Sequence, residues 1–297
     1  MAESTTTPRP RPTDWLEGAR PHTWPNAFAP VIAGTGAAAA TEGLVAWKAI
    51  VAVVVALALI IGVNYANDYS DGIRGTDDDR SGPLRLTGSG LARPKHVRSA
   101  AFAAFGVAGI SGLVLAATSA WWLIFLGAAC IAGAWFYTGG KNPYGYRGLG
   151  EVAVFVFFGL VAVLGTEFTQ AGRITWTGLA AAVAVGCFSS AVNLANNLRD
   201  IPTDRRSGKV TLAVRLGDRG TRRLWVVLAG APYLLSLAIA AAHLPALAAF
   251  IALPVSIAAA EPVVQGRTGR DLIQVLGATG KAMLLWSIVT ASALIFS

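Results

Sequence analysis

The sequence predicts an all-α, polytopic membrane protein in which nine transmembrane helices form one bundle. Hydrophobic residues make up 54% of the 297 residues, and charged residues only 13%. The mean hydropathy is +0.55. Apolar runs of about 20 residues, long enough to cross a bilayer as a helix, recur along the chain. One soluble core could not bury so much apolar sequence, so the composition excludes a water-soluble globular protein.

The nine predicted spans are joined by connections of very different length. In chain order, we expect the spans over 24–41, 46–67, 99–118, 121–138, 149–168, 174–198, 224–242, 243–260 and 276–296. The connections near Thr118 and His243 are very short. Those over 69–98 and 199–223, after the second and sixth spans, are long. Because long ordered loops tend to carry function, we expect the chemistry on the side of the membrane where these two loops lie.

The basic residues predict the orientation. With nine spans, the N-terminus and the loops after even-numbered spans share one side, and that side holds 21 of the 24 Lys and Arg residues. The opposite side holds Lys48 and Arg173. Because Lys and Arg are enriched in cytoplasmic loops, both long loops are predicted to face the cytoplasm, in a multi-pass protein of the inner (plasma) membrane. The basic segments also carry acidic residues, so the net charge of +8 does not indicate nucleic-acid binding.

The N-terminal segment differs in composition from the rest of the chain. The stretch up to Asp14 is rich in Thr, Pro and Arg and has no apolar run typical of a signal peptide. We therefore expect residues 1–20 to form a short disordered cytoplasmic tail. Residues 21–297 are expected to form a single transmembrane domain.

Two similar polar strings end the second and sixth spans. They repeat at an offset of 129 residues and contain Asn64, Asn67, Asp68 and Asp71 in the first string, and Asn193, Asn196, Asn197 and Asp200 in the second. In each string the positions i, i+3, i+4 and i+7 lie on one stripe of a helix. We expect the two stripes to face each other across a cavity. Pro202 disfavours a regular helix beyond Asp200, so Asp204 is expected on a turn or a short separate helix.

The carboxylates at these helix ends predict a bound cation. A helix C-terminus carries partial negative charge and disfavours carboxylates, yet Asp68, Asp71 and Asp200 all lie near one. Mg²⁺ binds through one or two carboxylates, waters and substrate phosphate oxygens. Two carboxylate walls that each hold one Mg²⁺ around a diphosphate fit this description. Asn64 and Asn193 alone could be polar groups that join helices, but eight acidic residues crowded into two loops are harder to explain in that way.

Basic residues in the same loops are candidates for phosphate binding. They are Arg74, Arg80, Arg85, Arg199, Arg205, Arg206 and Lys209. Arginine forks bind phosphate oxygens in bidentate fashion, although the orientation rule or pairing with Asp explains some of these residues equally well. A third segment, from Tyr137 through two glycines to Lys141, ends the fourth span. Lys141 could reach a phosphate or be one more orientation signal, and Tyr137 could belong to an interfacial aromatic belt.

These motifs resemble those of the UbiA superfamily of intramembrane aromatic prenyltransferases. The family's Asn-Asp-x-x-Asp motif after the second helix matches Asn67–Asp71, and its Asp-x-x-x-Asp motif after the sixth matches Asp200–Asp204. Its Tyr-x-x-x-Lys motif matches Tyr137–Lys141. The resemblance covers essentially the whole chain.

The first motif departs from the family's general pattern at one place. Where the family has a further Asp, four residues after Asp71, this chain has Gly75. The next acidic residues are Asp77, Asp78 and Asp79, and the sequence leaves open which of them contacts metal.

The strings are most similar to the branch that attaches polyprenyl groups to 1,4-dihydroxy-2-naphthoate in menaquinone synthesis. The resemblance implies Mg²⁺-dependent transfer from a polyprenyl diphosphate, with loss of the ring carboxylate, to give demethylmenaquinone. The implied ligands of two Mg²⁺ ions are Asn67, Asp68, Asp71, Asp200 and Asp204. The four aspartates and Lys141 are the expected catalytic residues. The expected substrate-binding residues are Asn64, Arg74, Arg85, Tyr137, Asn193, Asn196, Asn197, Arg199 and Lys209.

Other functions remain possible at this stage. Transfer to another aromatic acceptor, such as 4-hydroxybenzoate, would leave the fold unchanged. A CDP-alcohol phosphatidyltransferase is disfavoured because Asp71-Gly-Ile-Arg-Gly-Thr lacks the Ala-Arg step of that signature. A non-enzymatic transporter is disfavoured because transport sites lie near the bilayer midplane, whereas these carboxylates cluster at one membrane face.

Overall fold

The computed structural model describes residues 10–75 and 84–297, and this part of the chain is helical with no β-strand. The α-helices are α1 (Pro12–Gly18), α2 (Pro25–Ala39), α3 (Ala46–Gly72), α4 (Pro94–Thr118), α5 (Leu123–Phe136), α6 (Gly150–Val154), α7 (Ala162–Ala171), α8 (Trp176–Arg206), α9 (Leu212–Ala240), α10 (Leu253–Val264) and α11 (Ile273–Ile295). The remaining helical segments are η1 (Pro21–Thr23), η2 (Tyr144–Arg147), η3 (Phe155–Val161), η4 (Leu244–Ala252) and η5 (Gly269–Leu272). Segment η3 is a π-helix between α6 and α7. The predicted all-α class is confirmed.

Seven helical segments in the described part are long and apolar enough to cross a membrane. They are α3, α4, the run Gly150–Ala171, α8, α9, the run Leu244–Val264 and the run Gly269–Ile295. Two further predicted spans coincide with the shorter helices α2 and α5, which have 15 and 14 residues. The chain is therefore a helical protein with several candidate membrane spans.

Helix starts and bends follow local sequence chemistry. Pro12, Pro25 and Pro94 stand at the first position of their helices, where proline's missing N–H has no helical partner in any case. The side chain of Thr175 caps α8 by accepting a hydrogen bond from the Gly178 N–H. Helix α9 is kinked at Gly217, whose φ of 67° is a left-handed conformation that glycine adopts without strain.

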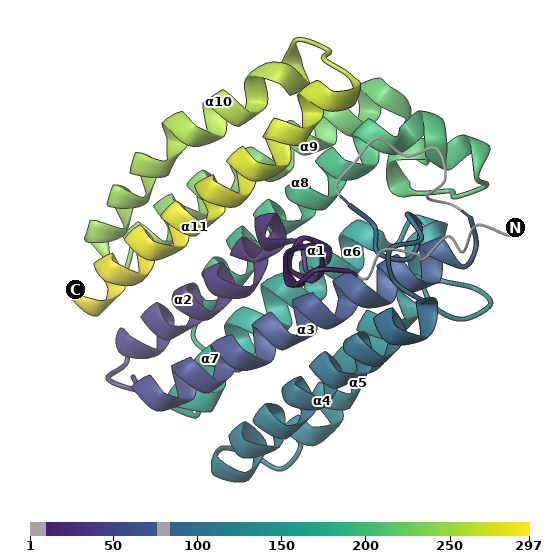
Figure 1. Cartoon of the computed structure of the whole chain (residues 1–297). Helices are drawn as coiled ribbons and strands as arrows, with labels where there is room; N and C mark the ends of the chain where they lie inside the picture. Colours follow the sequence, from purple (N-terminus) through teal and green to yellow (C-terminus); the bar gives the residue numbers. More distant parts are fainter. Residues whose placement is uncertain (1–9, 76–83) are drawn as a thin grey trace, which may run out of the picture.

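Helix α8 forms the centre of the bundle. In its most apolar window 83% of the residues are buried, against 22% for α3. Helices α4 and α5 lie at one end of the bundle and α10 and α11 at the other, with α8 between them (Figure 1). Large buried side chains join α8 to its neighbours, as Phe188 of α8 does by packing against Trp286 of α11. A Cβ on Gly159 of η3 would stand 2.5 Å from the Cα of Gly186, so small residues let the two backbones approach closely.

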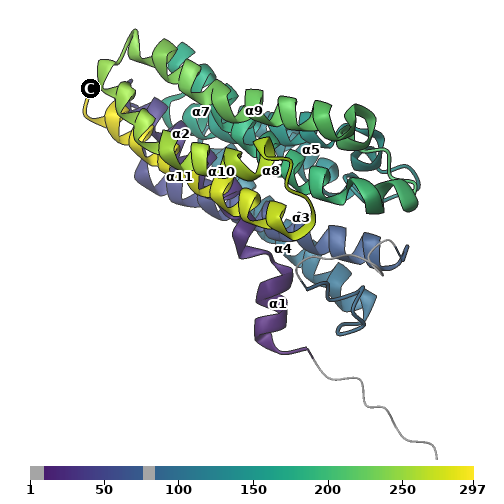
Figure 2. The same cartoon turned by 90° about the horizontal axis from the view of Figure 1, so that it is seen from above.

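Two expectations from the sequence were wrong. Helix α8 continues without a break through Pro202 to Arg206, so Asp204 lies on α8 itself. One proline removes a single backbone donor, and the packing of this buried helix outweighs that loss. The tail predicted over 1–20 is not wholly disordered, because residues 12–18 form α1, which projects from the bundle in Figure 2. Tyr65 of α3 anchors α1 by donating a hydrogen bond of 2.8 Å to the Trp15 carbonyl. Residues 1–9 lie outside the described residues.

Candidate active site

The two polar strings meet at one end of a cavity of about 390 Å³, a size typical of small-molecule sites. Both strings contribute to its wall, with Asn64, Asn67 and Asp71 from α3, and Asn193, Asn196, Asn197, Asp200 and Asp204 from α8. From there the cavity extends among apolar residues that include Leu115, Leu126 and Phe157. The prediction of two stripes that face one cavity therefore agrees with this geometry.

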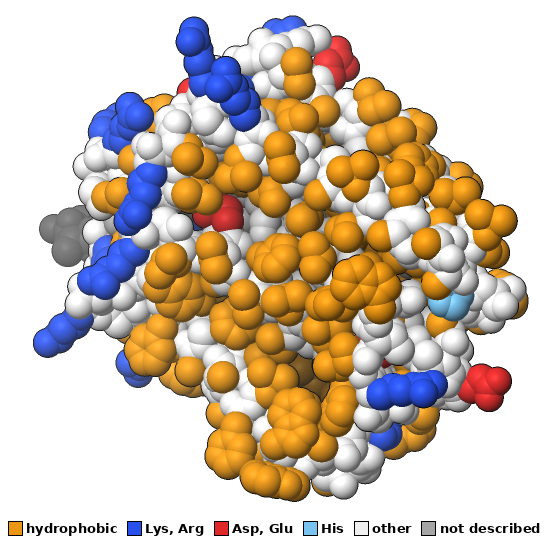
Figure 3. All heavy atoms as spheres, turned by 180° about the vertical axis from the view of Figure 1, so that it is seen from behind, with side chains coloured by type: hydrophobic (Ala, Val, Ile, Leu, Met, Phe, Trp, Pro, Cys, Tyr) orange, Lys and Arg blue, Asp and Glu red, His pale blue; other side chains and the backbone are white. Residues whose placement is uncertain are grey.

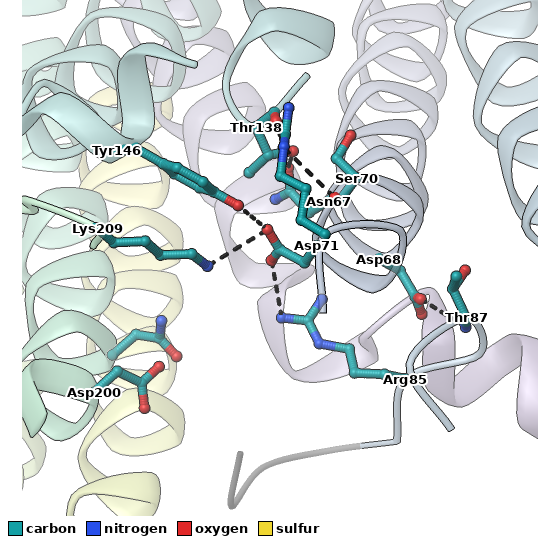
Figure 4. A network of polar contacts seen from close by, with 12 residues as sticks. Asn67, Asp68, Ser70, Asp71, Arg85, Thr87, Thr138, Tyr146, Asp200 and Lys209 are labelled. Carbon is teal, nitrogen blue, oxygen red and sulfur yellow. Dashed lines mark hydrogen bonds and ion pairs between the residues drawn. The ribbon is translucent and has the colours of Figure 1, made fainter. Parts of the chain in front are cut away.

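Asp71 is the centre of the polar end. It accepts a hydrogen bond from the Tyr146 hydroxyl, and its Oδ1 lies 3.4 Å from the Lys209 Nζ. Its Oδ2 lies 3.8 Å from an Arg85 guanidinium nitrogen. Figure 4 shows these three side chains converging on Asp71 from separate segments. The Lys209 ammonium also lies 4.5 Å from the centre of the Tyr146 ring, a cation–π arrangement that helps to hold it.

On the opposite wall, Asp200 is held by its own neighbour. Arg199 binds both carboxylate oxygens of Asp200, with Nε and Nη2 at 2.7 and 2.8 Å, and also donates to the Asn196 Oδ1 at 2.8 Å. The bidentate pairing fixes the orientation of the Asp200 carboxylate. Asp200 and Asp204 line the cavity, whereas Arg199 does not. Arg199, expected to bind phosphate, is placed here to orient a carboxylate.

Asp68 points away from the cavity. Its oxygens accept backbone N–H bonds from Leu86 at 2.7 Å and from Thr87 at 2.9 Å. The residue is 1% exposed and is not part of the cavity wall. These bonds hold in place the segment from which the Arg85 side chain reaches Asp71 (Figure 4). The structure thus places Asp68 one layer behind the residues that line the site.

The third motif is tied to the first by hydrogen bonds. Arg74 donates to the carbonyls of Thr138 and Gly140, and the Thr138 hydroxyl donates to the Asn67 Oδ1 at 2.7 Å. Tyr137 lines the cavity, and its hydroxyl lies 3.4 Å from the Asn193 Oδ1. Lys141 is exposed and lies outside the cavity wall. The third motif therefore places Tyr137 in the cavity wall, and Arg74 holds the backbone of the motif in position.

The donor set of the cavity suits a hard cation. Asn67, Asp71, Asp200 and Asp204 offer only carboxamide and carboxylate oxygens and side-chain amide nitrogens, and Mg²⁺ prefers oxygen ligands. Among residues 10–75 and 84–297, no three His, Cys, Asp or Glu side chains form a group that could hold a metal ion. Mg²⁺ commonly binds through one or two carboxylates together with waters and substrate phosphate oxygens. Asp77, Asp78 and Asp79 lie outside the described residues.

Sequence reasoning missed several residues around the cavity. Arg20, His22 and Tyr146 line it, and Glu151 lies behind its wall with a 2.6 Å hydrogen bond from Asn197. The sequence did indicate a role for Glu151, because an acidic residue within a membrane span is a functional candidate by default. Nothing in the sequence indicated a role for Arg20. Its left-handed φ of 52°, uncommon for a residue with a side chain, is visible only in the structure.

Fold and site together define a class: a helical membrane protein whose cavity is polar at one end and apolar beyond it. The model of the UbiA prenyltransferase family matches residues 27–288. The chain belongs to this family and is a prenyltransferase.

Individual relatives agree with this placement. The chain is 59% identical, over 95% of its length and 97% of the relative's, to 1,4-dihydroxy-2-naphthoate octaprenyltransferase of Mycobacterium tuberculosis. Its fold is similar to that of a UbiA homologue from Aeropyrum pernix K1, with a TM-score of 0.70 and 17% identity over 91% of this chain and 97% of that one. It is also similar to a UbiA homologue from Archaeoglobus fulgidus bound to GPP and Mg²⁺, with a TM-score of 0.67 and 13% identity over 96% of this chain and 100% of that one.

Proposed function

We propose that this enzyme transfers a polyprenyl group from a polyprenyl diphosphate to 1,4-dihydroxy-2-naphthoate, with loss of the ring carboxylate, to give demethylmenaquinone. One observation carries the proposal, namely a single cavity that joins a charged end to a long apolar interior. The two parts match the diphosphate and the hydrocarbon chain of one substrate. The identity of the acceptor is carried over from the naphthoate-using relative described above.

The residues at the polar end divide into metal ligands and phosphate ligands. Asn67 and Asp71 would hold one Mg²⁺, and Asp200 and Asp204 a second, with Asp68 acting from behind the first. When bound, Mg²⁺ supplies Lewis-acid stabilisation of the departing diphosphate. Lys209 and Arg85 line the same end and would bind diphosphate oxygens.

The apolar interior would hold the prenyl chain. Its wall includes Gly112, Gly127 and Gly165, and a Cβ built on any of them meets no atom within 4 Å. These positions therefore leave open space where a larger residue would project into the cavity. The face shown in Figure 3 is covered mainly with hydrophobic side chains, as expected of a surface that contacts lipid tails.

The membrane arrangement is part of the proposal. We place nine spans in one domain over 21–297, with the N-terminus and the polar end of the cavity in the cytoplasm and the protein in the plasma membrane. The presence of 21 of the 24 Lys and Arg residues on the side assigned to the cytoplasm supports this orientation. Many of the Lys and Arg side chains visible in Figure 3 gather along one edge. Labelling of single cysteines in intact cells, at Arg147 and at Arg173, would test it, with only the second accessible from outside.

A choice of acceptors tests the reaction. Membranes that contain the enzyme are supplied with Mg²⁺, octaprenyl diphosphate and equal amounts of 1,4-dihydroxy-2-naphthoate and 4-hydroxybenzoate, and products are identified by mass. We expect prenylated, decarboxylated naphthoquinol, and no product when Mg²⁺ is chelated. Preference for the benzoate would overturn the acceptor assignment. Product formation that persists in chelator would overturn the metal assignment.

A further inference from the structure

An unused acidic oxygen lies directly behind the cavity wall. Glu151, at the start of α6, is 4% exposed. Its Oε1 accepts a 2.6 Å hydrogen bond from the Asn197 Nδ2, and its backbone carbonyl accepts one of 3.0 Å from the Ser190 hydroxyl. Within the described residues, its Oε2 is buried without a hydrogen-bond partner, and so is the Nδ2 of Asn193. Buried polar groups in native proteins are normally paired, so these two unpaired atoms, one behind the cavity wall and one on a residue that lines it, indicate a missing ligand or a positioning role.

A purely structural role accounts for only part of this arrangement. Polar side chains often join membrane helices, and the Asn197–Glu151 bond does so between α8 and α6. A helix contact alone, however, does not require Asn197 to line the cavity beside Asn193 and Tyr137. The neighbouring η3 is a π-helix, a distortion that occurs frequently at functional sites.

Hydrogen bonding fixes which atoms of the two carboxamides remain available. Because the Asn197 Nδ2 is bound to Glu151, the Asn197 Oδ1 is left as an acceptor. The Asn193 Oδ1 faces the Tyr137 hydroxyl at 3.4 Å, so the Asn193 Nδ2 is left as a donor. Both residues lie one turn apart on α8, and both line the cavity together with Tyr137. A Cβ on Gly150 would lie 3.0 Å from the Tyr137 hydroxyl and 3.2 Å from the Asn193 Nδ2, so the group is closely enclosed.

The chemistry of this group differs from that of the diphosphate end. Asn193, Asn197, Tyr137 and Glu151 include no cation, in contrast to Lys209 and Arg85 beside Asp71. Asn197 lies three residues before Asp200, about 5 Å deeper along α8. The allylic carbon that reacts is bonded directly to the diphosphate, so a ring that attacks it must occupy this depth. A neutral donor and acceptor pair there suits phenolic hydroxyls better than phosphate.

We infer that Glu151 is a positioning residue for the aromatic acceptor: it holds the Asn197 carboxamide so that its oxygen accepts a ring hydroxyl, beside Asn193 and Tyr137. This inference rests on the proposed function, since it places the second substrate of that reaction. The Asn197 oxygen would lose its fixed direction without the carboxyl group behind it. Diphosphate binding, which uses other residues, would be unaffected.

Steady-state kinetics of Glu151→Ala test the inference. We expect the KM for the naphthoate to rise on the order of tenfold, the loss expected for one hydrogen bond, with the KM for octaprenyl diphosphate unchanged. Glu151→Gln keeps an acceptor for Asn197 and should restore most of the affinity. Asn197→Ala should reproduce the selective rise even if Glu151→Ala fails to fold.

A matched control separates this role from general damage. Glu167 is also a fully buried acid, but it binds Thr175 and lies outside the cavity wall, so Glu167→Gln should leave the ratio of the two KM values unchanged. An equal rise of both KM values in Glu151→Ala, or no rise in Asn197→Ala, would overturn the inference. If the wild-type enzyme forms no naphthoate product at all, the proposed function itself fails, which is a different result.

Discussion

The two walls of the active site carry the same polar pattern but are built in different ways. On α3, Asp68 and Asp71 bind segments that are distant in sequence, namely the backbone at Leu86 and the side chains of Tyr146 and Lys209. On α8, Asp200 is held by the adjacent Arg199. The carboxylates of the α3 wall are therefore held only once several loops have assembled around them, whereas the Asp200 carboxylate of the α8 wall is held by a neighbour on the same buried helix.

In both walls, the residue at the same position of the repeat binds a neighbouring segment of the chain. Asp68 and Asn197 are equivalent in the repeat, and each binds a neighbouring segment: the loop at 86–87 in one case and Glu151 in the other. At about 100° per residue, this position lies at the edge of the stripe formed by the other three. Its side chain can therefore anchor a segment beside the cavity, as Asp68 does from behind the wall and Asn197 does while it lines the cavity.

Removing either central carboxylate should have the largest effect. Asp71→Asn and Asp200→Asn should each lower kcat by about a thousandfold, because charge stabilisation of the leaving group is lost. Limited proteolysis should then tell the walls apart, with faster cleavage of the 84–88 segment in Asp71→Asn only. Asp218, which pairs with Arg222 on α9, supplies the control, since Asp218→Asn should retain activity. Equal cleavage of the 84–88 segment in both variants would contradict the proposed difference between the two walls.

Asp68→Asn should have a smaller effect than Asp71→Asn. The amide weakens two backbone hydrogen bonds to the segment that carries Arg85, so we expect a loss in kcat/KM of about 10- to 100-fold. The Mg²⁺ concentration for half-maximal activity should change little in this variant. A large increase in that concentration would instead make Asp68 a direct metal ligand.

Substitution of Gly127 should affect only long substrates. The open space in front of this glycine would be filled in Gly127→Phe, so activity with octaprenyl diphosphate should fall by roughly tenfold or more, while activity with geranyl diphosphate is retained. Gly186 is the contrasting case, because a Cβ there meets the Phe155 ring at 2.7 Å. Gly186→Ala should lower thermal stability and affect both substrates alike. An equal loss of activity with both diphosphates in Gly127→Phe would show that the prenyl chain does not occupy this part of the cavity.

The smallest expected effect is a pH dependence at His22, which lies outside the spans. Desolvation by the surrounding groups, followed by the charges of Arg20 and Arg199, lowers the pKa of His22, although part of the residue stays exposed to solvent. The folded state thus favours the neutral imidazole, so stability is unaffected above the unfolded pKa and falls as the pH drops from about 7 to about 5. The unfolding temperature of the purified protein should decrease less over this range in His22→Asn. An identical decrease in both proteins would assign the effect to other groups.

The sequence was informative where chemistry follows helical spacing. The stripe positions correctly brought Asn64, Asn67 and Asp71 to one cavity with their counterparts on α8, because those positions share a helix face. Spacing could not show that Asp68 binds a loop 18 residues away, since that contact depends on tertiary packing. Local rules also failed at Pro202, where the burial of α8 overrides the helix-breaking tendency of proline.

The π-helix over 155–161 has a consequence for the length of its span. Hydrogen bonds there run to the fifth residue instead of the fourth, so the segment holds more residues per turn than an α-helix. Deleting one residue within it would let the turn relax to an α-helix and keep the downstream residues in rotational register. The same deletion in α8 would turn every residue beyond it by about 100°. This stretch is therefore a place where the chain can lose one residue without a change in the rotational register of the helix that follows.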